Sequence, residues 1–189
     1  MKKLLVFALL LAAACAGAGC AQLGPQYYKP SQEYSFYPPS GWRYTPPSEE
    51  ITVMQSHHVK GHDFRPNLNI VVEESDLVLE EYVEKQRTEW LPKLPGFRMI
   101  DEGYVTFGEV WRATYDHYNP HFKETLRSVL QLALYDNKIY AATFMAPKKI
   151  WNSYRDMFGD SLDSFKFGED AVPIGEKKGA YEKPELKTK

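Results

Sequence analysis

The sequence has 189 residues, of which 43% are hydrophobic and 25% are charged, a composition typical of one globular domain. Its formal net charge of −2 lacks the excess of Lys and Arg that polyanion-binding proteins carry, so we expect no nucleic-acid partner. Both cysteines, Cys15 and Cys20, lie near the N-terminus, so the rest of the chain has neither disulfides nor thiol chemistry.

The N-terminus has the parts of an export signal. Lys2 and Lys3 precede an apolar stretch over residues 4–14, which is too short to cross a bilayer, because a transmembrane helix needs about 20 residues. Small residues follow and end in Cys20, which resembles the signal peptide of bacterial lipoproteins. The resemblance implies a signal peptide over residues 1–19 and a lipid anchor on Cys20.

The N-terminal sequence allows two alternatives to a lipid anchor on Cys20. Lipoprotein signals usually have Leu three places before the cysteine, where this chain has Gly17, and Cys15 is a second candidate. An ordinary secretory signal is the other alternative. Ala21 resembles the residue that sorts lipoproteins to the outer membrane. We expect an envelope protein that is lipid-anchored in the outer membrane and faces the periplasm.

Beyond the signal, the chain divides into a tether, a domain and a tail. Residues 20–32 contain Gly and Pro and few aliphatic side chains, which indicates a tether. Residues 169–189 are rich in Lys, Glu, Pro and Gly, which predicts a disordered charged tail. In the domain between them, residues 33–168, period-two alternation predicts strands at 34–37, 42–44, 51–58, 68–73 and 97–107.

Two segments have apolar residues at helical spacing. The first is predicted over residues 79–90, with Ser75-Asp76 as its cap and Pro92 after its end. The second is predicted to begin at Pro147 and to continue toward Phe167.

The segment Glu109–Ala146 is predicted to form three consecutive strands. The third of these strands is apolar on both faces, which is typical of a central strand with layers packed above and below it. Asp136-Asn137 favours a tight turn with positive φ. Because helices and strands are segregated along the chain, we predict the α+β class, with an antiparallel β-sheet flanked by helices.

Three segments together resemble the PsbP-like and DcrB-like domains. They are the start Tyr34-Ser35-Phe36-Tyr37-Pro38-Pro39-Ser40-Gly41-Trp42, the helix start Leu79-Glu80-Glu81-Tyr82 and the ending Ser164-Phe165-Lys166-Phe167. The resemblance spans Glu33 to Gly168 and implies an α/β/α sandwich. Members of this family are largely non-catalytic proteins of the envelope or thylakoid lumen that assist membrane complexes. The resemblance implies no catalytic residue here.

Three groups of residues suggest chemistry. Gly159-Asp160-Ser161-Leu162 spells the block of the GDSL hydrolases, but no histidine follows Ser161, so the serine has no downstream base and we expect a structural role. His57, His58, His62 and Asp63 are residue types that bind zinc or copper, and His58, His62 and Asp63 form the candidate metal site. Trp42 and Tyr44 are candidate partner contacts, because Trp and Tyr anchor interfaces.

The leading hypothesis is a non-catalytic envelope lipoprotein, without a cofactor, that acts as a binding or accessory factor for a membrane-associated protein complex. The alternative is a periplasmic metal or small-ligand binding protein that uses the segment from His57 to Asp63. A hydrolase is the third hypothesis, and perturbed titratable groups in a deep pocket would favour it.

The position of Cys20 after a complete signal leads to a prediction about anchoring. Cys20→Ala should leave a soluble or uncleaved protein, because the lipid acceptor is lost, whereas Cys15→Ala should stay membrane-bound. Fractionation after labelling with a fatty-acid analogue measures this. Label that is kept in Cys20→Ala and lost in Cys15→Ala would show that Cys15 is the lipidated residue.

Overall fold

A computed structural model of the protein describes residues 23–45, 48–105 and 109–172. The predicted signal peptide, Cys15 and Cys20 lie outside the described residues, as does most of the predicted tail. In the part that is described, no helix has the length and apolar character needed to cross a membrane.

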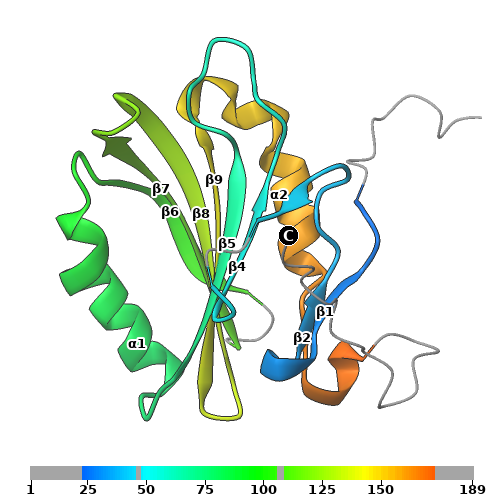
Figure 1. Ribbon diagram of the computed structural model, residues 1–189. Coiled ribbons are helices and arrows are strands. Elements are labelled where there is room, and N and C mark those ends of the chain that lie inside the picture. The colour runs from blue at the N-terminus through cyan, green and yellow to red at the C-terminus, as the bar shows by residue number, and fades with distance from the viewer. Residues whose placement is uncertain (1–22, 46–47, 106–108, 173–189) are drawn as a thin grey trace, which may run out of the picture.

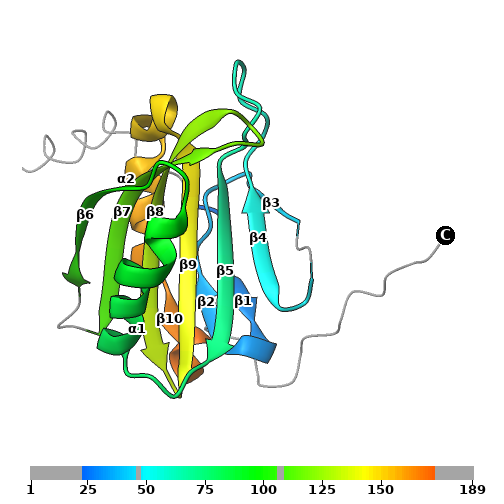
Figure 2. The ribbon, with the colours of Figure 1, turned by 90° about the vertical axis from the view of Figure 1, so that its left-hand side faces the viewer.

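The centre of the molecule is a seven-stranded antiparallel sheet in the order β3-β4-β5-β9-β8-β7-β6. Figure 2 shows this sheet face-on, with α1 in front of it. Its strands are β3 (Arg43–Tyr44), β4 (Ile51–Gln55), β5 (Asn67–Glu74), β6 (Arg98–Val105), β7 (Val110–Asn119), β8 (Glu124–Tyr135) and β9 (Lys138–Pro147).

The three predicted strands at the centre of the sequence are β7, β8 and β9. The turn between β8 and β9 consists of Asp136 and Asn137, with φ of 48° and 55°. Both residues are in the left-handed region that Asp and Asn tolerate better than most side chains, so this predicted turn is confirmed. The strand β4 is shorter than predicted and ends at Gln55, which leaves His57 and His58 in a loop.

The sheet is covered on both faces, as Figure 1 shows. On one face α1 (Leu79–Lys85), the π-helical turn η2 (Gln86–Trp90) and the 3-10 turn η3 (Leu91–Lys93) pack over β7 and β8. On the other face lie η5 (Lys148–Ser153) and α2 (Arg155–Asp163). Each face therefore has its own hydrophobic core, and β9 contributes Ile139 to the first and Phe144 to the second.

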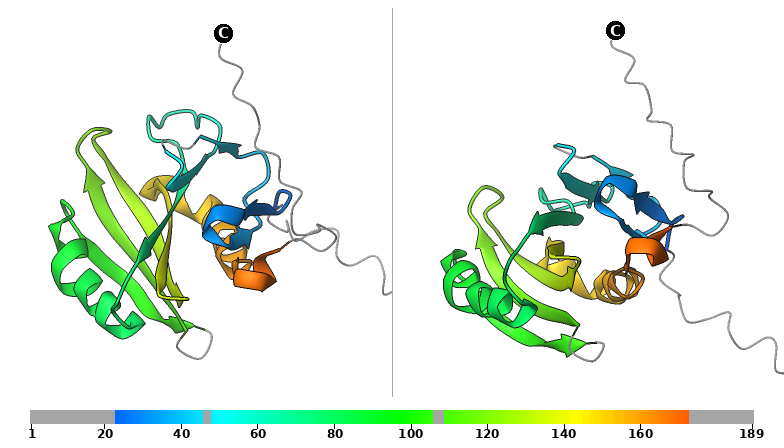
Figure 3. Two further views of the ribbon diagram at one scale, coloured as in Figure 1. Left: turned by 60° about the horizontal axis from the view of Figure 1, so that its bottom comes forward. Right: turned by 90° about the horizontal axis from the view of Figure 1, so that it is seen from below.

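A second, three-stranded sheet lies beside α2 on the same face. Its order is β1-β2-β10, with β1 (Tyr27–Lys29), β2 (Tyr34–Phe36) and β10 (Lys166–Phe167). Viewed from below in Figure 3, α2 and this small sheet lie on one side of the large sheet and α1 lies on the other. The α+β fold with an antiparallel sheet between helical layers is thus confirmed.

The two ends of the domain differ from their predicted boundaries. The tether predicted for residues 20–32 contains β1 and the 3-10 turn η1 (Pro30–Gln32), because Tyr27 pairs with Phe36 through the backbone and packs its ring 5.6 Å away. At the other end, η6 (Gly168–Ala171) continues the domain and buries Ala171 completely. Both sheets and both cores lie within residues 23–172, so a chain that starts at Ala21 keeps the whole described fold.

Both helices differ from prediction at their ends. The residue before the first helix is Val78, without a side-chain cap, and Ser75 instead accepts a hydrogen bond from the Leu77 N–H at 3.2 Å. Ser75 lies too far upstream to reach the free N–H groups of the first turn. The second predicted helix is interrupted at Tyr154, between η5 and α2, and its predicted end pairs as strand β10.

Stacking of Phe144 on Phe158, with ring centroids 4.3 Å apart, predicts a large cost for truncating either ring. Phe158→Ala should lower the free energy of unfolding by about 3–5 kcal/mol, because it leaves a cavity between α2 and the sheet. Val71→Ala, at a side chain that is 37% exposed, should cost less than about 1 kcal/mol. Urea denaturation measures both, and equal losses would contradict this packing.

Candidate functional site

The predicted metal site is not assembled in the described residues. His58 and Asp63 are exposed in the β4–β5 loop, whereas His62 turns inward and places Nδ1 2.5 Å from Oε1 of Glu124. No group of three or more His, Cys, Asp and Glu side chains within residues 23–45, 48–105 and 109–172 could hold a metal ion. The reason is the early end of β4, which places these side chains along an open loop instead of on one face.

The two predicted partner contacts have different surroundings. Trp42 is half-buried and contacts Phe144 and Phe158 edge-on, with ring centroids 5.9 and 5.8 Å away, so its ring belongs to the core. Tyr44 is 46% exposed, although its ring also lies 5.5 Å from Tyr27. Trp42 therefore packs against the core with part of its ring still exposed, and both residues stay predicted contacts.

Ser161 has a structural setting in α2. Its side chain is fully buried, and the hydroxyl donates to the carbonyl oxygen of Tyr37 at 2.7 Å. The neighbouring Ser164 hydroxyl accepts from the Tyr37 N–H at 2.8 Å. Together the two serines satisfy both backbone groups of Tyr37 and hold α2 against the chain that leaves β2.

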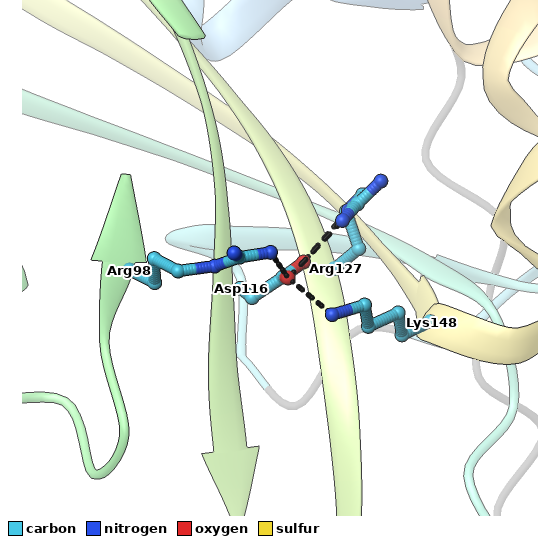
Figure 4. A network of polar contacts seen from close by, with 4 residues as sticks. All are labelled: Arg98, Asp116, Arg127 and Lys148. Carbon is cyan, nitrogen blue, oxygen red and sulfur yellow. Dashed lines mark hydrogen bonds and ion pairs between the residues drawn. The ribbon is translucent and has the colours of Figure 1, made fainter. Parts of the chain in front are cut away.

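A cluster of three ion pairs that share Asp116 lies where β6 begins and β7 ends. Asp116, 3% exposed, points toward three cations, as Figure 4 shows. Its carboxylate accepts from Arg127 at 2.7 and 3.1 Å and from Arg98 at 3.1 Å, and it lies 2.9 Å from Nζ of Lys148. Arg127 and Arg98 are the residues directly opposite Asp116 on β8 and β6, so sheet register brings them together.

The cluster has more positive than negative charge. Burial would by itself raise the pKa of Asp116, but hydrogen bonds from Arg127, Lys148 and Arg98 outweigh burial and hold that pKa well below its usual range. Asp116 is therefore ionised at neutral pH and faces three cations. Because the Arg98 and Lys148 side chains are 64% and 43% exposed, the surplus positive charge reaches the surface.

Cations gather around this cluster and form what we call the basic end of the sheet. It consists of the β4–β5 loop, the last residues of β7, the β7–β8 turn, the first four residues of β8, the first residue of β6 and the start of η5, which strand pairing places at one end. All five histidines of the chain lie in or beside these segments. The basic end carries seven cations, namely Lys60, Arg65, Arg98, Lys123, Arg127, Lys148 and Lys149, and three acids, namely Asp63, Asp116 and Glu124.

The opposite end of the sheet, which we call the acidic end, has the reverse charge. It consists of the end of β5, the start of α1, the residue before β7, the β8–β9 turn, η6, and Glu33, whose carbonyl accepts a hydrogen bond from the Gly168 N–H. Ten acids lie there against Lys138 and Lys166. The acids are Glu33, Glu73, Glu74, Asp76, Glu80, Glu81, Glu109, Asp136, Glu169 and Asp170.

The acidic end also has a groove of about 590 Å³ between α1, the large sheet and β10. Two residues of its wall, Val78 and Tyr135, are 53% and 41% exposed. Gly168 adjoins it with φ of 59°, and a Cβ there would collide with the Tyr135 hydroxyl. The lining is mostly apolar, with two carboxylates, and consists of Val78, Leu79, Glu80, Glu109, Val110, Ala133, Leu134, Tyr135 and Phe167.

Neither charged end is visible in the composition, because the net charge of the whole chain hides their separation. One ion pair of the basic end can nevertheless be predicted from the sequence. A short turn between β7 and β8 places Asp116 opposite Arg127, so the hairpin register alone could have identified this pair. Arg98 and Lys148 are distant in sequence, and only the folded sheet brings them to Asp116.

The Asp116 cluster predicts a pH-dependent stability. A lowered pKa in the folded state means that the carboxylate stabilises the fold above about pH 4 and that this contribution is lost as pH falls. Asp116→Asn should lower the free energy of unfolding by about 2–3 kcal/mol at pH 7. The difference from wild type should shrink toward pH 2.

Urea denaturation over a pH series measures this effect. Asp63→Asn is the control, because Asp63 is an exposed acid at the same end of the sheet. A constant difference between wild type and Asp116→Asn at every pH would refute the assigned role of the carboxylate.

Searches of family models and of curated protein sequences found no match to this chain. Solved structures are similar in fold. Cyanobacterial PsbP (CyanoP) from Synechocystis sp. is 16% identical, with a TM-score of 0.57, and the match covers 81% of this chain and 96% of that one.

Two further structures are similar. LpqN, described as involved in cell envelope biogenesis of Mycobacterium tuberculosis, is 14% identical over 76% of this chain and 91% of that one, with a TM-score of 0.56. The Ran-binding protein Mog1p of Saccharomyces cerevisiae is 11% identical over 77% of this chain and 96% of that one, with a TM-score of 0.56. The resemblance to PsbP-like domains is thus confirmed at the level of the fold.

Proposed function

We propose that this protein is a non-catalytic envelope lipoprotein that acts as a binding or accessory factor for a membrane-associated protein complex. The observation that carries the proposal is the groove at the acidic end. Its apolar wall is open to solvent at Val78 and Tyr135, and exposed apolar grooves are typical of docking sites.

The occupant we propose is a segment of a protein partner that is both positively charged and apolar. Glu80 and Glu109 line the groove, and both carboxylates are exposed. The further acids of the acidic end extend the negative field around them. Charge complementarity of this kind speeds association and rejects acidic partners.

Placement at the envelope rests on the predicted signal and on similar proteins. LpqN is described as an envelope biogenesis protein and Mog1p as a Ran-binding protein, which supports a contact function for this fold. The anchor on Cys20 and the sorting residue Ala21 favour the outer membrane, with the domain in the periplasm. The partner is then itself a protein of the membrane or its surface.

A charge placed in the groove should abolish function. Val78→Lys adds a bulky cation where we expect a cationic segment to bind, so it should fail to complement a deletion strain. Val71→Lys is the matched control, because Val71 is also an exposed valine but lies on β5. This variant should complement the deletion strain. A photoreactive residue at position 78 should crosslink one envelope protein in intact cells, and Glu80→Lys should reduce that crosslink at least about tenfold.

Enzymatic function would give the reverse pattern. If Ser161→Ala folds normally and behaves like the deletion, whereas Val78→Lys complements fully, the contact model is wrong. Urea denaturation of each variant shows whether a failure to complement comes from loss of the fold.

A further inference from the structure

We propose that the basic end is a membrane-docking surface for anionic phospholipid headgroups. This surface is separate from the protein-binding groove, which lies at the opposite end of the same sheet.

The positive charge of the basic end is available to a ligand. Six of its seven cations are exposed, and Arg127 is the half-buried exception. Of its three acids, Asp116 is buried under three cations and Glu124 contacts His62. Among the described residues that make up the basic end, Asp63 alone therefore presents an exposed carboxylate. Clusters of four to eight Lys and Arg residues beside a transmembrane helix or on an amphipathic helix are typical of surfaces that bind anionic lipids, and the basic end has a cluster of this size.

The path of the chain favours a membrane as the occupant. The first described residue, Leu23, forms a bridge with Pro39, and Gly24 donates to the Pro38 carbonyl. The chain from Pro39 leads to Trp42, whose ring contacts Phe144 near the basic end of β9. The chain before Leu23 therefore joins the domain on the half nearer the basic end.

The distance from the predicted anchor, Cys20, to the first described residue, Leu23, is short. Three residue steps separate Cys20 from Leu23, and they can span at most about 10 Å. A lipid on Cys20 would hold Leu23 within about 10 Å of its attachment point, a distance comparable to the Debye length of about 8 Å at physiological salt. An anionic leaflet would then attract the basic end and repel the acidic end.

The basic end also has an exposed aromatic side chain of a type that binds at membrane surfaces. Tyr118, at the end of β7, is 40% exposed and its backbone N–H donates to the Pro95 carbonyl. Tyr is enriched at membrane interfaces because its ring is apolar and its hydroxyl is polar. Tyr118 follows Asp116 at a spacing of two on β7, so its side chain leaves the same face of the strand as the Asp116 carboxylate.

A vesicle experiment tests the surface without any lipid anchor. The chain from Ala21 to Lys189 keeps the described fold and lacks the lipid acceptor Cys20. We expect it to co-sediment with vesicles of one-third phosphatidylglycerol in phosphatidylcholine and not with pure phosphatidylcholine. Binding should weaken strongly between about 50 mM and about 300 mM salt, because surface charges are then screened.

Two pairs of charge reversals locate the binding surface. Lys60→Glu with Lys149→Glu removes exposed cations from the basic end and should lower the partition constant at least about tenfold. Lys85→Glu with Lys166→Glu changes the net charge equally, on α1 and β10, and should leave binding within about twofold. Thermal unfolding confirms that each variant is folded.

Three outcomes would overturn the proposal. They are equal loss in both double variants, equal binding to charged and neutral vesicles, and no binding to phosphatidylglycerol at low salt. If vesicle binding is absent and the Lys60→Glu, Lys149→Glu variant loses a crosslink to an envelope protein, the surface belongs to a protein partner. The groove is unaffected by these outcomes, because its tests use Val78 and Glu80.

Discussion

The fold depends on the central strand pair β8–β9, which must be covered on both faces. Leu130 and Leu132 of β8 point to the face that carries α1, whereas Val129 of β8 and Phe144 of β9 point to the face that carries α2. Burial of each apolar side chain contributes about 1.5–3 kcal/mol to the stability of the fold. Exposing either face of the sheet would therefore cost a large part of that stability. The two helical layers and the small sheet follow from this requirement, and they leave the two ends of the large sheet open to solvent.

The two open ends of the large sheet carry opposite charge. At one end, strand register collects Arg98 and Arg127 around Asp116, and η5 adds Lys148. At the other end, the β8–β9 turn and the start of α1 surround an apolar groove with carboxylates. A domain polarised in this way has a preferred orientation in the field of a charged surface. A single lipid-anchored domain can then place its groove away from the bilayer, where a partner can reach it.

Period-two alternation was enough to predict β7, β8 and β9, and with them the class of the fold. It failed for Tyr27–Lys29, because three residues are too few to show a period and their ring contacts come from β2. Trp42 could not be assigned from sequence, since an aromatic ring suits a core and an interface equally well. The basic end was hidden because Lys60, Arg98 and Lys148 lie far apart in sequence and only the sheet brings them together.

The orientation of the domain at a bilayer can be measured directly. The sequence has no cysteine after Cys20, so Lys149→Cys and Val78→Cys each give one labelling site in a protein that carries the predicted lipid on Cys20. A fluorophore at each site is compared in vesicles that contain phosphatidylglycerol and a quencher attached to the lipid headgroup. We predict strong quenching at position 149 and little at position 78. Equal quenching at both sites, or stronger quenching at position 78, would contradict the account.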